Sequence, residues 1–280
     1  MLIARRKDQA KYPQAWDELE AAWYPGAGPS GTRLYDLSGR DNHGTLTNGP
    51  TWGVNRGQSV INLDGTNDHV NVPTSESLNF GLKPASISVW VAPTNISAYR
   101  IILVKRLSSA PFSQFSIATG FVNNAGGAVA GKQISIFWYN GGNLSISDTA
   151  TQGYRTTADV VDGNLHSIIV VRGLSGPPKI YVDGVDMALT TIQPGITPVN
   201  ADNDLPLLLG ASTGGTIAMG GSLSQVSVYK RILHADDIKL LTQRPGIAHE
   251  PKPRVFYSIP ASVKAWLFRR QSQIIGGGLG

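Results

Sequence analysis

Short segments in which apolar and polar residues alternate recur along most of this 280-residue chain. Residues 86–93, for example, place Ile87, Val89 and Val91 on one face of a strand and Trp90 on the other. Alternation with a period of two is typical of a β-strand that is buried on one side. Many such segments separated by residues rich in Gly, Asn, Asp and Pro predict an all-β fold, a two-sheet antiparallel sandwich.

Turn signals between these segments predict how some of the strands are joined. Residues 59–65 and 69–73 both alternate, and the Asp-, Asn- and Gly-rich residues 64–68 between them predict a hairpin. A second hairpin is predicted at residues 179–187, where Asp183 and Gly184 form a type I′ turn pair. Residues 206–211 form an apolar run that fits a strand buried on both faces, and the change of phase near Ser224 indicates a bulge.

Two helices interrupt the strands and help to divide the chain. Residues 13–21 have Trp16 and Leu19 at helical spacing, and residues 235–242 begin with two acids and end before Pro245. We therefore predict an N-terminal arm with a short helix at residues 1–20, a sandwich at residues 21–243, and a C-terminal arm at residues 244–280.

The positive charge of the chain is confined to the C-terminal arm. The net charge is +5, and residues 244–280 hold six basic residues against Glu250 alone, so the other residues sum to zero. A basic segment on a neutral body suggests either contact with an acidic partner or a solubilising tail. We favour a protein partner over nucleic acid, because the arm is also rich in apolar residues that need to be covered. The predicted docking residues are Arg254, Val255, Phe256, Tyr257, Trp266, Phe268, Arg269, Arg270, Ile274 and Ile275.

Two loops at residues 36–44 and 64–68 offer oxygen ligands for calcium, which takes six to eight oxygens. The alternative, which we favour, is that these side chains shape turns by bonding to their own backbone. Calcium is therefore only a possible cofactor, and no other cofactor is expected. The candidate ligands are Asp36, Asp41, Asn42, Asp64 and Asp68.

Aromatic residues near predicted loops could stack on sugar rings. Trp138 and Tyr139 precede a polar turn that would add amide hydrogen bonds, although Trp138 could instead pack in the core of a sandwich. The candidate sugar-contacting residues are Trp138, Tyr139, Asn140, Asn143 and Tyr99.

The sequence gives little support to catalysis. No Glu lies between residues 77 and 249, no predicted strand carries two acids two residues apart, and the chain has no cysteine. A paired-carboxylate glycosidase, a thiol enzyme and the common nucleophile and phosphate-binding motifs are therefore not expected. His166 lies at a strand position and is expected to be a packed or edge residue. The first residues lack the apolar core of a signal peptide, and no long apolar run follows, so we expect no membrane anchor.

Several motifs occur together in a fixed order. They are AAWYPG at 21–26, LYDLSGRDNHGTLTNGPTW at 34–52, LDGTNDHVNVP at 63–73, SISVWVAP at 86–93, DGNLHSIIVVRG at 162–173, KIYVDGV at 179–185, LLLGA at 207–211 and VSVYKRILHADDIKLL at 226–241. In this order they resemble the laminin-G-like, concanavalin A-like jelly-roll domain.

The resemblance implies a sandwich of two large antiparallel sheets that binds carbohydrate or protein, often with calcium. The sequence departs from the family pattern at Ser224 and Gln225, where an acid is common, and at His43, which also replaces a commoner acid.

A shorter resemblance concerns the end of the chain, where FRRQSQIIGGGLG at 268–280 is similar to the C-termini of phage-encoded versions of the domain. It implies a non-enzymatic virion protein, capsid decoration or tail-associated, that is made in the host cytoplasm. The arms would anchor it to capsid, tail or sister subunits in a homo-oligomer, and the displayed sandwich would aid adsorption. The alternative is a carbohydrate-binding module or adhesin that recognises surface glycans.

Overall fold

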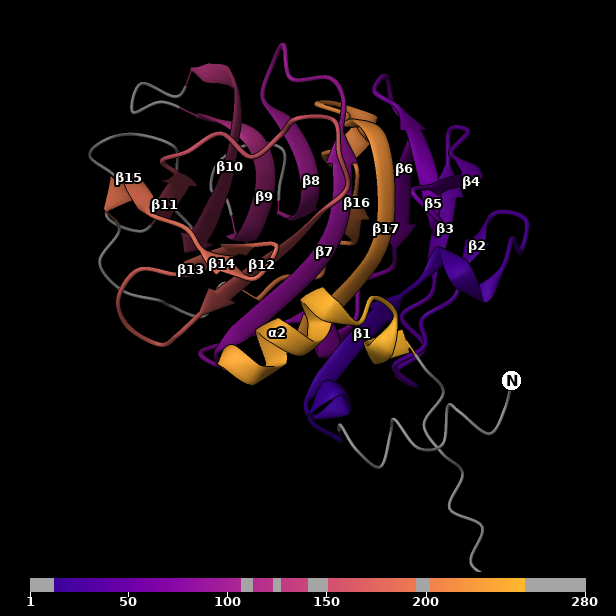
Figure 1. Cartoon of the computed structure of the whole chain (residues 1–280), viewed down its shortest axis with the longest axis horizontal. Coiled ribbons are helices and arrows are strands. Elements are labelled where there is room, and N and C mark those ends of the chain that lie inside the picture. Colours follow the sequence, from indigo (N-terminus) through magenta and orange to yellow (C-terminus); the bar gives the residue numbers. More distant parts are fainter. Residues whose placement is uncertain (1–12, 107–112, 123–126, 141–150, 195–201, 250–280) are drawn as a thin grey trace, which may run out of the picture.

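The computed structural model describes residues 13–106, 113–122, 127–140, 151–194 and 202–249. Two antiparallel β-sheets lie face to face within this part of the chain (Figure 1). No helix among these residues is long and apolar enough to cross a membrane. The two sheets confirm the predicted all-β, two-sheet antiparallel jelly-roll sandwich. Of the predicted arms at residues 1–20 and 244–280, residues 1–12 and 250–280 lie outside the described residues.

The first sheet has eight strands and is centred on β17, which pairs with three others. Its strand order is β14-β13-β12-β7-β17-β5-β4, and β1 pairs with the half of β17 that β5 leaves free. The strands are β1 (Leu19–Trp23), β4 (Thr51–Asn55), β5 (Gln58–Asp64), β7 (Ala85–Pro93), β12 (His166–Arg172), β13 (Lys179–Val182), β14 (Val185–Asp186) and β17 (Gly220–Tyr229).

The second sheet has nine strands in the order β15-β11-β10-β9-β8-β16-β6-β3-β2. The strands are β2 (Arg33–Leu34), β3 (Gly44–Thr47), β6 (His69–Val72), β8 (Arg100–Lys105), β9 (Ser113–Val122), β10 (Ala128–Asn140), β11 (Thr151–Thr156), β15 (Leu189–Pro194) and β16 (Leu207–Leu209).

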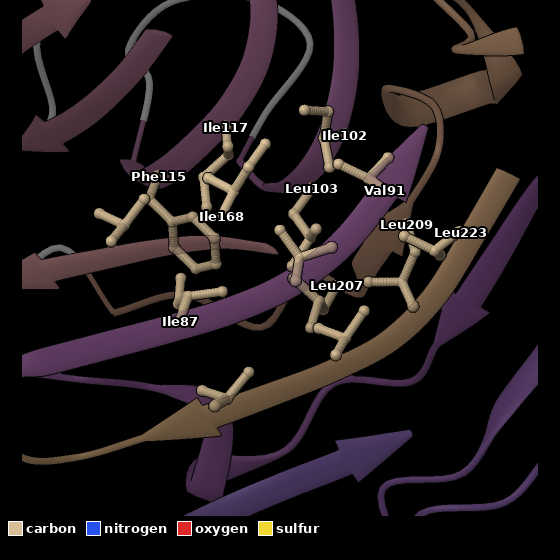
Figure 2. Packing of buried hydrophobic residues seen from close by; sticks show 14 of the residues in the cluster. Ile87, Val91, Ile102, Leu103, Phe115, Ile117, Ile168, Leu207, Leu209 and Leu223 are labelled. Carbon is tan, nitrogen blue, oxygen red and sulfur yellow. The ribbon is translucent and has the colours of Figure 1, made fainter. Parts of the chain in front are cut away.

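The main core fills the space between the two sheets with alternate side chains from each (Figure 2). Ile87 and Val91 of β7 face Leu103 of β8 and Leu209 of β16, and all four are almost fully buried. The period-two pattern read from the sequence corresponds to these inward positions.

Each sheet is also covered on part of its outer face. The eight-stranded sheet is covered by α2 (Ala235–Gln243) and by the 3-10 helices η1 (Pro13–Trp16) and η5 (Ile247–His249). The outer face of the nine-stranded sheet carries a separate buried cluster that includes Tyr99, Phe137 and Tyr139. Because part of the nine-stranded sheet is buried on both faces, several aromatic side chains that the sequence pattern predicted to be exposed are buried.

Several local predictions are confirmed by the structure. The turn of the β13–β14 hairpin has φ of 51° at Asp183 and 85° at Gly184, the left-handed values that a type I′ turn requires. The register of β17 against β7 shifts between Leu223 and Val226, which is the expected bulge. The helix α2 begins after His234, whose backbone N–H donates to Asp237 at 2.9 Å.

Two local predictions are wrong. The segments at 59–65 and 69–73 do form strands, but β5 pairs with β4 and β17 whereas β6 pairs with β3 and β16. The loop at 64–68 therefore crosses between the sheets and closes no hairpin. Residues 13–21 are also not one helix, because η1 ends at Trp16 and β1 begins at Leu19, inside the predicted N-terminal arm. Pairing with β17 outweighs the weak helical spacing there.

Candidate functional site

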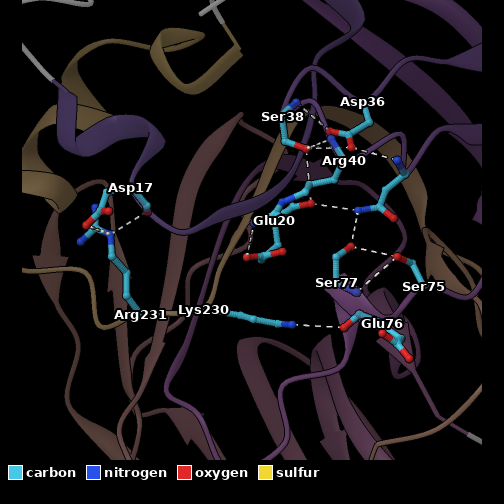
Figure 3. A network of polar contacts seen from close by, with 11 residues as sticks. Asp17, Glu20, Asp36, Ser38, Arg40, Ser75, Glu76, Ser77, Lys230 and Arg231 are labelled. Carbon is cyan, nitrogen blue, oxygen red and sulfur yellow. Dashed lines mark hydrogen bonds and ion pairs between the residues drawn. The ribbon is translucent and has the colours of Figure 1, made fainter.

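The first predicted calcium loop is organised around the buried carboxylate of Asp36 (Figure 3). One of its oxygens accepts the backbone N–H groups of Ala22 and Ser38, both at 2.9 Å. The other accepts the Ser38 hydroxyl at 2.8 Å and the N–H of Asn42 at 2.9 Å. The Asn42 amide in turn donates to the carbonyl of Glu20 at 2.9 Å, while Asp41 projects into solvent with its side chain 90% exposed. These bonds tie the loop to β1.

The second predicted calcium loop uses its carboxylates in the same way. Asp64 accepts the backbone N–H of Thr66 at 2.8 Å, and this bond holds the pKa of Asp64 below its ordinary value. Asp68 accepts the backbone N–H of Asp64 at 3.1 Å, and burial raises the pKa of Asp68. Both carboxylates are therefore engaged by backbone N–H groups of their own loop.

The two loops do not combine their ligands. Asp36 and Asn42 bond to β1 and the residues beside it, whereas Asp64 and Asp68 bond within their own loop. Among the residues that the structure describes, no group of three or more His, Cys, Asp or Glu side chains is placed to hold a metal ion. Calcium binding stays a prediction, and its test is given in the Discussion.

The predicted sugar-stacking rings are placed differently from the expectation. Tyr139 is 0% and Tyr99 3% exposed, so neither ring presents a face to a ligand, which corrects that prediction. Trp138 packs against the main core, with Phe115 stacked on it at 5.3 Å between ring centroids. The guanidinium of Arg172 covers Trp138 at 4.5 Å, and burial lowers the pKa of Arg172 to about 10. Tyr99 and Tyr139 are structural because the outer face of the nine-stranded sheet is covered there, whereas Trp138 is only partly buried.

Other predicted site residues lie outside the described part of the chain. Asn143 falls in residues 141–150, and β10 ends at Asn140, whose side chain is not described. The docking residues at 254–257, 266–270 and 274–275 all fall in residues 250–280.

His166 lies at the start of β12 and is partly buried, as expected of an edge residue. Its two ring nitrogens lie 2.7 Å from Asp183 and 3.0 Å from Asp162. Burial lowers the pKa of His166, but the bonds to the two carboxylates outweigh burial and raise it. The imidazole therefore joins the β13–β14 turn to the loop before β12 through these two carboxylates.

A polar pocket of about 620 Å³ opens beside β1. Four of its lining residues, Glu20, Ser38, Arg40 and Lys230, are drawn in Figure 3. Residues that are distant in sequence meet there because β1 pairs with the end of β17, and the loop after β2 folds back over β1 through Asp36. The pocket is lined by Trp16, Glu18, Leu19, Glu20, Ser38, Gly39, Arg40, Lys83 and Lys230.

The charged groups in the pocket are only partly paired. Arg40 donates to the buried carboxylate of Glu20 at 3.2 Å. Lys230 donates to the backbone carbonyl of Glu76 at 3.1 Å (Figure 3). Burial lowers the pKa of Lys230, Glu20 and Asp202 raise it, and the positive charges of Lys83 and Arg40 lower it further. The pocket thus carries carboxylate, ammonium, guanidinium and hydroxyl groups around one indole ring.

Sequence reasoning missed this pocket. Glu18 and Glu20 were assigned to a helix, so their two-residue spacing at the start of a strand was overlooked. Arg40, Lys83 and Lys230 come from three loops that only the tertiary fold brings together. The one local signal was the series Leu19 to Trp23, which can be read as a strand once its partner β17 is known.

Comparison with known proteins decides the family. A family model of the concanavalin A-like lectin/glucanases superfamily matches residues 64–239, more than half of the chain. The chain belongs to this superfamily. The strands β1 to β4 and all of β5 except Asp64 lie before the matched region and complete the two sheets of this concanavalin A-like sandwich. A search of curated proteins found no significant match.

Solved structures with the same fold include binding domains and an enzyme. The binding domain of Paraclostridial Mosquitocidal Protein 1 matches with a TM-score of 0.59 and 16% identity over 82% of this chain and 52% of that chain. The binding domain of Botulinum Neurotoxin DC, in complex with SialylT, matches with a TM-score of 0.58 and 13% identity over 82% and 52%. Trypanosoma rangeli sialidase in complex with sialic acid matches with a TM-score of 0.54 and 13% identity over 80% and 32%.

These identities establish a shared fold alone. The chain also spans about half the length of the two binding domains and about a third of the sialidase.

Proposed function

We propose that this concanavalin A-like domain is a carbohydrate-binding module whose sugar site is the pocket beside β1. The observation that carries the proposal is the lining of that pocket, which sets Trp16 among charged and hydroxyl groups from four separate segments. Sugars present several hydroxyls and an apolar ring face at once, so they are recognised by dense hydrogen-bonding groups next to an aromatic ring. Two proteins with a similar fold, a botulinum neurotoxin binding domain in complex with SialylT and a sialidase in complex with sialic acid, bind ligands of this class.

The pocket fits binding better than hydrolysis. Glu18 and Glu20 are the pair of carboxylates that a glycosidase site would need. However, Arg40 occupies Glu20 in an ion pair, and Glu18 lies exposed at the rim. Arg40 would have to release Glu20 before that carboxyl group could act on a glycosidic bond. We therefore propose a non-catalytic role.

A glycan array probed with the purified 280-residue protein tests this role. We expect binding to a defined set of glycans without release of sugar, and we expect Arg40→Ala to weaken that binding about tenfold through loss of polar contacts. Arg33→Ala is the matched control, because Arg33 is also an exposed arginine but does not line the pocket.

Equal binding by the two variants would contradict the location of the site. The absence of any glycan ligand would contradict the function. Release of reducing sugar that Glu20→Gln abolishes would establish a glycosidase instead.

A second candidate function is display on a phage particle, and the distribution of charge favours it. The net charge of +5 lies within residues 244–280, together with the predicted apolar docking residues. We propose that this segment attaches the sandwich to a virion, in capsid or tail, or to sister subunits. The two functions are compatible, because a displayed sandwich can bind surface glycans during adsorption.

Deletion of residues 250–280 tests the display proposal and keeps α2 and η5 intact. We expect the truncated protein to retain its melting temperature and its glycan binding but to lose incorporation into particles, or to fall to monomer mass if it assembles alone. Unchanged particle incorporation and unchanged oligomer mass would contradict the proposal.

A further inference from the structure

The two lysines of the pocket have donors that the folded chain leaves unused. An ammonium group can donate three hydrogen bonds. Lys230 donates to a single carbonyl, that of Glu76, although its side chain is partly buried. Lys83 makes no side-chain hydrogen bond or ion pair with the residues that the structure describes. Both ammonium groups line the pocket, so these donors are available to a ligand.

Two of the acidic residues nearby already accept hydrogen bonds from other groups. Glu20 is already paired with Arg40 at 3.2 Å, and Glu18 is exposed at the rim. Asp202 lies outside the lining and accepts the backbone N–H of Gly81 at 2.8 Å. The pocket lining therefore holds three cations against two carboxylates, and one of those carboxylates is occupied.

Lys230 is also in an unfavourable electrostatic position in the free protein. It is desolvated by burial, and although Glu20 and Asp202 attract its charge, burial together with the repulsion from Lys83 and Arg40 outweighs them and lowers the pKa of Lys230. A ligand anion between Lys83 and Lys230 would replace lost water and offset this repulsion. A neutral sugar would bury the same ammonium groups further without supplying a counter-charge.

We propose that the ligand of this pocket is an acidic glycan, whose carboxylate or sulfate group binds between Lys83 and Lys230. The inference rests on the proposed carbohydrate-binding function and names the chemical class of the sugar. The ring of that sugar lies toward Trp16, and its anionic group accepts hydrogen bonds from the free ammonium donors.

The test measures the affinity of wild type and of lysine variants for acidic glycans and for neutral counterparts with the same skeleton. Sialylated and uronate glycans are compared with their methyl esters, and sulfated glycans with desulfated ones. We expect wild type to prefer one acidic series by about tenfold or more, with the preference falling as salt rises. The Lys83→Met/Lys230→Met double variant is expected to lose this preference, whereas Lys239→Met, an exposed lysine outside the pocket, retains it.

The outcomes separate this inference from the proposed function. Equal binding of acidic and neutral glycans by wild type would overturn the inference and leave carbohydrate binding in place. A preference retained by the double variant would place the anion elsewhere and also overturn it. The series that shows the preference identifies the anion as carboxylate or sulfate.

A titration with inorganic sulfate, followed by the lysine ¹³Cε resonances in NMR, tests the anion site without any glycan. We expect sulfate to move the Lys230 resonance, identified by its loss in Lys230→Met, and to leave the Lys239 resonance unmoved. An unmoved Lys230 resonance would contradict the anion site whatever the array shows. A moved resonance together with an empty array would retain the anion site and reject the carbohydrate.

Discussion

Replacing Asp36 by asparagine is expected to lower the free energy of unfolding by about 2–4 kcal/mol, because buried donors lose a charged acceptor. The carboxylate receives four hydrogen bonds from Ala22, Ser38 and Asn42, three of them from backbone N–H groups. An asparagine side chain keeps one acceptor oxygen, but its N–H₂ group would face N–H donors from which it cannot accept a hydrogen bond. Denaturant unfolding measures the loss.

Asp41→Asn is the matched control for this substitution. It makes the same chemical change five residues away, where the side chain is 90% exposed, and should alter stability by no more than about 0.5 kcal/mol. Equal losses in both variants would contradict the structural role of Asp36. The same samples test calcium: we expect equal melting temperatures with calcium and with chelator, and a higher value with calcium would establish a metal site.

Replacing Arg231 by methionine is expected to cost about 3–5 kcal/mol, because it leaves the carboxylate of Asp237 buried without its partner. Arg231 donates to both oxygens of Asp237, at 2.7 and 3.1 Å, and to the backbone carbonyls of Gln14 and Asp17 (Figure 3 shows its contact with Asp17). This one side chain thus links η1, β17 and α2. Lys179→Met is the control, because its ion pair with Asp186 is about half exposed on both sides and its loss should alter stability far less than Arg231→Met does.

The pH dependence of stability gives this prediction a second readout. Burial raises the pKa of Asp237, but the hydrogen bonds and charge of Arg231 outweigh burial and hold it below 3.8. A lowered folded-state pKa contributes stability above the unfolded-state value that is lost as the pH falls through the folded-state value. Wild type should therefore lose this contribution below about pH 4, and Arg231→Met should show a shallower loss there. Parallel curves for the two proteins would contradict the assignment.

The sequence predicted the strands far better than it predicted their partners. Alternation located β5 and β6, and the Asp-Gly-Thr-Asn-Asp loop was rightly read as a turn. That loop joins strands of different sheets, because pairing depends on β16 and β17, more than a hundred residues away. Local residue types determine a change of direction, but they do not determine which strand lies alongside.

The site was harder to predict for the same reason. Tyr99 and Tyr139 lie near loops, but a second buried cluster on the outer face of the nine-stranded sheet encloses them. The pocket beside β1 takes its cations from Arg40, Lys83 and Lys230, none of which belongs to a motif. The Asp- and Asn-rich loop at residues 36–44 was noticed for its oxygens. In the structure the hydrogen bonds of Asp36 fix this loop against β1, and Arg40 of the same loop bonds to Glu20 in the pocket lining.

The position of β17 in the first sheet has a consequence for biosynthesis. This strand is the shared neighbour of β1, β5 and β7, all of which precede it by more than a hundred residues. During translation the edges of these strands that will pair with β17 stay unpaired until β17 has been synthesised. Unpaired strand edges can pair with the wrong strand or with another chain. Lys230 directly follows β17, so the pocket can form only after nearly the whole sandwich has been synthesised. A nascent chain that stops short of this strand therefore has neither the complete first sheet nor the complete pocket lining.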